Sequence, residues 1–153
     1  MNKEQLIESA MALKTVKPET LAELSSKQAH LVAKINQTML ERPDIKMLVG
    51  ENNLEMMKDN HANHAKFVYS ILQRPNAQVL VATVLWVFRS YRSRGFHQNY
   101  WSAQLNTWIN IFKQDLSQET CDDILPLYDW FIINIPHFTN LSDSQLEDVD
   151  TKH

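Results

Sequence analysis

Two histidines, His61 and His64, are the side chains of this chain best suited to bind a cofactor. They lie in the segment Asn60-His61-Ala62-Asn63-His64, and residues at i and i+3 project on the same side of a helix. Both imidazoles could then face one cavity and meet a haem iron. A zinc site is not expected, because the remaining ligands and an HExxH pattern are absent nearby. The alternative is that both rings are polar core residues, hydrogen bonded to Asn60, Asn63, a tyrosine or the backbone.

Three arginines stand close together at Arg89, Arg92 and Arg94. Such a group could bind the carboxylates of a cofactor or of an acidic partner through charge-assisted hydrogen bonds. The alternative is structural: cations near the end of a helix complement its dipole and pair with acids of other helices, such as Asp129. The sequence leaves both interpretations open.

The 55 residues between Asp59 and Asp115 contain no Asp or Glu. They carry six of the fifteen Lys and Arg, so their formal charge is +6, against −9 for the flanks and −3 for the whole chain. The centre therefore lacks the carboxylate pairs of acid–base enzymes, and no serine stands in a His–Asp context. We expect no catalytic residues and no enzymatic activity.

Composition bounds the class of protein. The 153 residues suit one domain, and two glycines are far below the usual ~7%, which disfavours β-rich folds and Gly-rich phosphate loops. The single Cys121 excludes an internal disulfide. No apolar run reaches about eighteen residues, and no signal peptide is evident. We expect a soluble, cytoplasmic protein without a membrane or nucleic-acid partner, since a net charge of −3 does not suit nucleic acid.

Apolar residues recur at steps of three and four, the period of amphipathic helices. Helices are expected over residues 3–13, 18–42, 51–72, 76–94, 98–116 and 117–134, with a short turn or helical piece over 45–49. The helix over 76–94 is apolar all round, so it should be the most buried one. Its N-cap is expected at Asn76, and that of the last helix at Ser117.

Proline sets the limits of the last helix. Pro126 predicts a kink or a later start, and Pro136 predicts the end of the helix. From Leu141 the chain becomes acidic and loses its period. We therefore expect one helical domain over 1–141 and an acidic tail or linker over 142–153.

A pocket is predicted where the helices over 51–72 and 76–94 pack face to face. The two histidines would reach it from the first helix and Tyr91 from the second. The predicted pocket residues are His61, His64, Tyr91, Met57 and Trp86.

The order of long helices resembles the sensor globins, especially the globin-like N-terminal sensor domains of stressosome (RsbR-type) proteins. The resemblance is carried by an arginine-bearing helix that ends in Gly95-Phe96, followed by a long aromatic helix with Trp101 and Trp108. It covers roughly residues 20 to 140. It implies an all-α, globin-like bundle of about six helices, in which 51–72 and 76–94 correspond to the E and F helices, and the last two to G and H.

The resemblance also bears on cofactor and assembly. Haem-binding members of the family place the proximal histidine about four residues before that glycine, where this chain has Tyr91. The chain thus resembles the members that lack haem, although a non-standard haem ligand, His61, His64 or Tyr91, stays open. The family dimerises through its G and H helices. The implied dimer interface comprises Trp101, Trp108, Tyr128 and Phe131.

The expected function is that of a dimeric, non-enzymatic sensor domain in signal transduction, in the manner of the stress-response family, acting on a signalling protein partner. One alternative is a haem-binding gas or redox sensor, with His61 or His64 as metal ligand. The other is a helical adaptor without a ligand, which a filled centre beside His61, His64 and Tyr91 would favour.

Overall fold

The computed structural model describes the backbone of residues 1–151 and the side chains of residues 1–143. All regular secondary structure in this part of the chain is α-helical, which confirms the predicted all-α class. The eight helices are α1 (Lys3–Met11), α2 (Pro18–Leu40), α3 (Ile45–Val49), α4 (Leu54–Gln73), α5 (Ala77–Ser93), α6 (Asn99–Asp115), α7 (Gln118–Ile133) and α8 (Ile135–Thr151).

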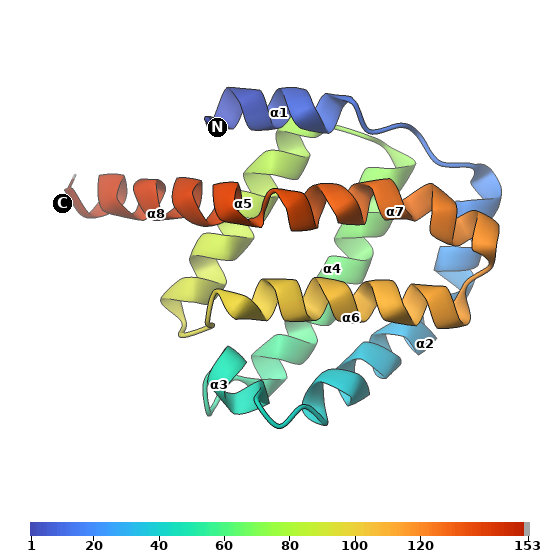
Figure 1. Cartoon of the computed structure of the whole chain (residues 1–153), viewed down its shortest axis with the longest axis horizontal. Helices are drawn as coiled ribbons and strands as arrows, with labels where there is room; N and C mark the ends of the chain where they lie inside the picture. The colour runs from blue at the N-terminus through green and yellow to red at the C-terminus, as the bar shows by residue number, and fades with distance from the viewer. Residues whose placement is uncertain (152–153) are drawn as a thin grey trace.

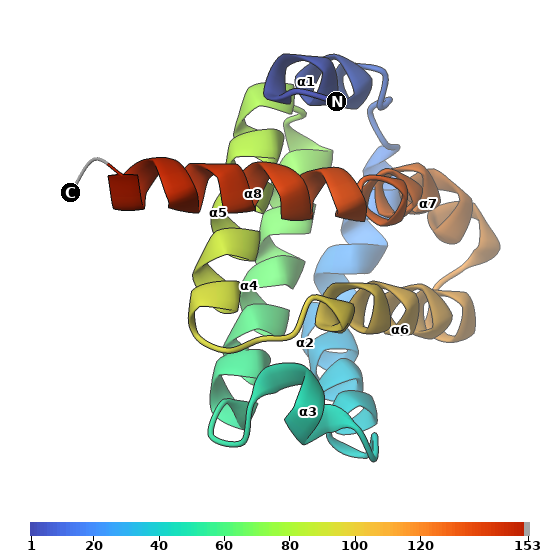
Figure 2. The same ribbon diagram turned by 60° about the vertical axis from the view of Figure 1, so that its left-hand side comes forward.

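The long helices form two crossing layers (Figure 1). In one layer α2, α4 and α5 lie side by side, and in the other α6 runs alongside α7, with α8 continuing from α7 across α5 (Figure 2). The close backbone packing joins α2 to α4 and α6, α6 to α7, and α5 to α1 and α8. The helix α5 is thus held mainly by α1 and α8, while fewer close backbone approaches join it to its neighbour α4.

Local sequence explains where the helices begin and end. The side chains of Asn76 and Ser117 accept hydrogen bonds from backbone N–H groups in the first turns of α5 and α7, as predicted for N-caps. Gly95 follows α5 with φ of 101°, in the left-handed region that favours glycine, and the chain turns there towards α6. The predicted boundaries of α4, α5 and α6 agree with the structure within a few residues.

The predicted helix over 117–134 agrees with α7, but the prediction that helical structure ends at Pro136 is wrong. Pro136 does not stop a helix but lies in the first turn of α8, where a missing N–H donor costs nothing. Pro126 lies inside α7, which begins eight residues earlier at Gln118, so the later start is also wrong. The predicted boundary at 141/142 falls inside α8, while residues 152 and 153 of the predicted tail lie outside the described residues.

The most buried long helix is α6 rather than α5. Packed between α2 and α7, α6 buries residues on most of its surface, whereas α5 leaves Val79 and Trp86 48% and 56% exposed. The apolar composition of α5 predicted full burial, but α5 lies at the edge of its layer and so exposes one side (Figure 2). No helix of the described chain is long and apolar enough to cross a membrane.

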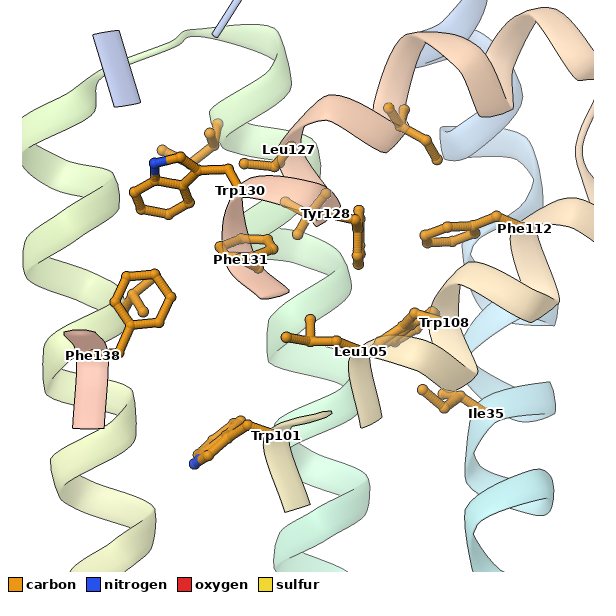
Figure 3. Close-up of a cluster of buried hydrophobic side chains, with 14 of the residues drawn as sticks. Ile35, Trp101, Leu105, Trp108, Phe112, Leu127, Tyr128, Trp130, Phe131 and Phe138 are labelled. Carbon is orange, nitrogen blue, oxygen red and sulfur yellow. The ribbon is translucent and has the colours of Figure 1, made fainter. Parts of the chain in front are cut away.

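The aromatic side chains of α6 and α7 fill the space between the layers (Figure 3). Trp101, Trp108, Tyr128 and Phe131 are 1–5% exposed within the single chain. A second copy could not contact these buried rings, so their prediction as a dimer interface is wrong. An aromatic stripe at helical spacing has the same appearance in sequence whether it packs inside one chain or between two.

Candidate ligand cavity between α4 and α5

A cavity of about 230 Å³ lies between α4 and α5, under α6 and the junction of α7 and α8. Its walls are uncharged and mostly apolar. The lining residues are Asn60, Asn63, His64 and Phe67 of α4; Thr83, Val84, Trp86, Val87, Phe88 and Tyr91 of α5; Trp101, Gln104 and Leu105 of α6; and Phe131 and Phe138. Asn63 and Trp86 are both exposed, so the cavity opens to the surface beside them.

Three of the five predicted pocket residues, His64, Tyr91 and Trp86, line this cavity. The other two, His61 and Met57, do not: both are 0% exposed. They lie on α4 with their side chains in the packed interior. The sequence placed all of them on one face, but the face of α4 is divided between the cavity and the filled core.

His64 is partly accessible because it borders the cavity. Its Nε2 lies 2.7 Å from the hydroxyl oxygen of Tyr128, and its ring stacks on Trp108 with the ring centres 5.3 Å apart. Burial, and then the nearby His61, lower the pKa of His64 to about 3, so the ring is neutral at pH 7. We assign the proton to Nδ1, because the buried Tyr128 hydroxyl then donates to Nε2 and is not left unpaired.

His61 belongs to a different environment. Its Nδ1 lies 2.7 Å from the side-chain oxygen of Asn36 on α2, and its ring contacts Tyr100 and Trp108. Its Nε2 is buried and has no hydrogen-bond partner among the described residues. Burial lowers the pKa of His61 to about 4, because a protonated ring would leave a charged N–H group unpaired there. For His61 the structure agrees with the interpretation as a polar core residue.

Asn60 organises the polar groups at one end of the cavity. Its side-chain oxygen accepts hydrogen bonds from the Tyr100 hydroxyl at 2.7 Å and from the Gln104 amide at 3.0 Å. The hydroxyl of Tyr91 interacts with the side chains of Asn60 and Asn63. Burial raises the pKa of Tyr91, and these amides oppose the rise. The hydroxyl of Tyr91 is therefore a neutral group at pH 7.

The arginines form no common anion site. Arg92 makes an ion pair with Asp143 on α8, and Arg94 is exposed at the end of α5. Arg89 is partly buried and engaged with other groups. None of the three lines the cavity. The structural interpretation fits Arg92, although its partner is Asp143 rather than Asp129.

A wider groove of about 590 Å³ lies where the loop after α1 meets the α4–α5 turn and α7. Both acids of the groove already accept hydrogen bonds: Asp123 from the Lys17 backbone N–H and the Thr20 hydroxyl, and Asp122 from the Gln118 amide. The groove contains none of the predicted site residues. Volume alone does not indicate function, so we regard the smaller cavity as the candidate site.

The cavity does not fit a haem in its present form. Its volume lies below the about 300–1,000 Å³ typical of sites for drug-sized ligands. Nε2 of His64 is occupied by Tyr128, and His61 does not reach the cavity.

Sequence reasoning missed several cavity residues. Asn60 and Asn63 were considered only as partners of the histidines, although an amide that is buried within a helix, as Asn60 is, can itself indicate a polar interior. Gln104 gives the same sign among the aromatic residues of α6. Phe138 could not have been found, because the helix was expected to end before it.

No known protein family, curated protein or solved structure matches the chain significantly.

Proposed function

We propose that this protein is a non-enzymatic sensor domain that binds a small molecule in the cavity between α4 and α5. The observation that carries the proposal is the position of the cavity, which is bordered by α5 and by Phe138 of α8. Its lining, uncharged and largely apolar with a few polar groups, is of the kind that small-molecule sites have. The same lining lacks the carboxylates and activated nucleophiles that a catalytic site would need.

The helix α8 is the natural output element. Its Phe138 contacts Phe88 of α5 and Trp130 of α7, with ring centres 5.3 and 5.2 Å apart. The ion pair between Arg92 and Asp143 makes a second link between α5 and α8 further along. A ligand that binds better to one packing arrangement of α5 and α8 than to another would shift the equilibrium between the two arrangements. A signalling partner that binds α8 could then respond to the change in its position.

The globin-like character remains part of this proposal. It is supported by the order of long helices and by two crossing layers in which α6 and α7 lie side by side. In such an arrangement the cavity lies between the helices that correspond to E and F. We also propose a homodimer, although the interface must use surface residues other than the buried rings of α6 and α7.

The two alternative functions, a ligand-free adaptor and a haem sensor, predict different cavities. A ligand-free adaptor would be expected to have a filled centre beside Tyr91 and His64, so the cavity argues against it. A haem sensor would require α4 and α5 to separate and His64 to leave Tyr128. The side chains of His64 and Tyr91, which reach the cavity from opposite helices, are the observation in its favour.

Native mass spectrometry combined with an absorption spectrum of the freshly purified protein tests these functions together. We expect a dimer without an intense haem band in the violet. A haem band that is lost in His64→Ala would instead establish the haem sensor. A monomer would contradict the dimer but not the ligand site.

The proposed output is tested by filling the cavity with a side chain. Val87→Phe adds a ring to the wall of the cavity, whereas Val79→Phe adds the same ring to the exposed surface of α5. We expect amide hydrogen exchange in α8 to change in Val87→Phe and to stay as in wild type in Val79→Phe. Equal exchange in both variants would contradict a role for α8 in transmitting ligand binding.

A further inference from the structure

The cavity favours a neutral ligand. None of its lining residues is an Asp, Glu, Lys or Arg, and His64 is uncharged at pH 7. A charged molecule would lose its hydration on entering and would find no opposite charge as compensation. Carboxylates, phosphates and amines are therefore poor candidates for the interior of this site.

The walls favour an aromatic ligand of limited size. Seven Phe, Tyr and Trp rings border the cavity, and aromatic rings interact well with one another when stacked with an offset or edge to face. An apolar cavity of about 150 Å³ holds benzene. By proportion, the 230 Å³ here would accommodate a molecule of about nine or ten non-hydrogen atoms, such as a benzene ring fused to a five-membered ring.

The hydroxyl of Tyr91 is a hydrogen-bonding group at the cavity wall that a ligand can meet. The oxygen of Asn60 is occupied by Tyr100 and Gln104, and Nε2 of His64 by Tyr128. The hydroxyl oxygen of Tyr91 interacts with the amides of Asn60 and Asn63. A tyrosine hydroxyl can donate as well as accept, and Tyr91 lies at the cavity wall, so its proton can be offered to an acceptor on a ligand.

We propose that the ligand class of this site is a small, neutral aromatic molecule with a carbonyl group, whose oxygen accepts a hydrogen bond from the Tyr91 hydroxyl. This inference rests on the proposed function, since it names what the sensor cavity binds. Shape and apolar contact hold the ring system, and the single hydrogen bond distinguishes a ketone from the matching hydrocarbon.

The test uses titration calorimetry of the full chain with two probes of nearly equal shape, indan-1-one and indane. Each is titrated into wild type, Tyr91→Phe and the control Tyr69→Phe. Tyr69 lies on α4 outside the cavity, so the control removes a tyrosine hydroxyl without touching the site. We expect wild type and Tyr69→Phe to bind indan-1-one about five- to tenfold more tightly than indane, because indane leaves the Tyr91 donor unpaired. In Tyr91→Phe this preference should disappear.

The outcomes separate the two levels of the proposal. Equal affinities of wild type for the two probes, or a preference that persists in Tyr91→Phe, would overturn the ligand class while leaving a ligand-binding cavity in place. Failure of wild type to bind either probe would also overturn the ligand class, and the sensor site itself is then judged by hydrogen exchange in Val87→Phe.

Discussion

The two sides of α4 differ in how they are filled. On the side of α2, His61 lies in a closed interior with Asn36, Tyr100 and Trp108. On the side of α5, His64 borders a cavity instead. Figure 3 shows the same division from α6, because Trp108 lies towards α2 whereas Trp101 lies towards α5.

The cause of this difference is the position of α5. Its backbone packs on α1 and α8, and its approach to α4 is not close enough for side chains to close the gap. Two histidines one turn apart on the same helix thus experience different surroundings. His61 and His64 are the same residue type, so their different roles come from the helices that they face.

The largest expected effect is the loss of a ring from the filled side. Trp108 is 1% exposed, and Trp108→Ala should lower the free energy of unfolding by about 3–5 kcal/mol through lost contacts and a new cavity. Trp86→Ala on the cavity side removes a ring that is 56% exposed and should cost less than about 1 kcal/mol. Urea unfolding measures both. Similar losses in the two variants would mean that the sides do not differ in packing.

The second effect is acid sensitivity, which both sides share. The folded-state pKa values of His61 and His64 are lowered to about 4 and about 3, so below about pH 6.5 the unfolded chain binds more protons than the folded one. The stability from these neutral rings is present above pH 6.5 and is lost as the pH falls. By pH 5 the loss should be about 2 kcal/mol for each histidine.

The double variant His61→Gln/His64→Gln should therefore lose less stability than wild type between pH 7 and pH 5. Comparing pH slopes rather than absolute stabilities removes the cost of the substitution itself. An unchanged slope in the double variant would contradict the burial of these rings as neutral groups.

A third, smaller effect is the change in stability when a larger side chain is introduced on each side of α4. Val68 is 5% exposed on the α2 side of α4, where the hollow that it borders measures about 30 Å³, so Val68→Phe should cost about 1–3 kcal/mol by overpacking. Val87→Phe places the same extra volume in the cavity and should change stability by less than about 1 kcal/mol. Thermal unfolding followed by circular dichroism distinguishes these outcomes. A larger loss in Val87→Phe than in Val68→Phe would argue that the cavity is not available space.

The helical architecture could be predicted from sequence because apolar spacing, caps and glycines act locally. The caps at Asn76 and Ser117 are examples. Pro136 misled the prediction, since a proline after one helix has the same appearance as a proline in the first turn of the next.

The site was predicted only in part, because it depends on distances between helices. Spacing placed His61 and His64 on one face of α4, but it could not say which ring would meet α2 and which would meet α5. Likewise, the aromatic stripe of Trp101 and Trp108 predicted a buried face without indicating whether its partner was the same chain or a second copy.

Crystals exposed to xenon under pressure would test the contrast between the two sides most directly, because xenon enters apolar cavities that are large enough to admit it. We predict xenon density between α4 and α5, near Phe88 and Phe138, and its loss in Val87→Phe. Xenon bound on the α2 side beside His61, or none between α4 and α5, would contradict the account.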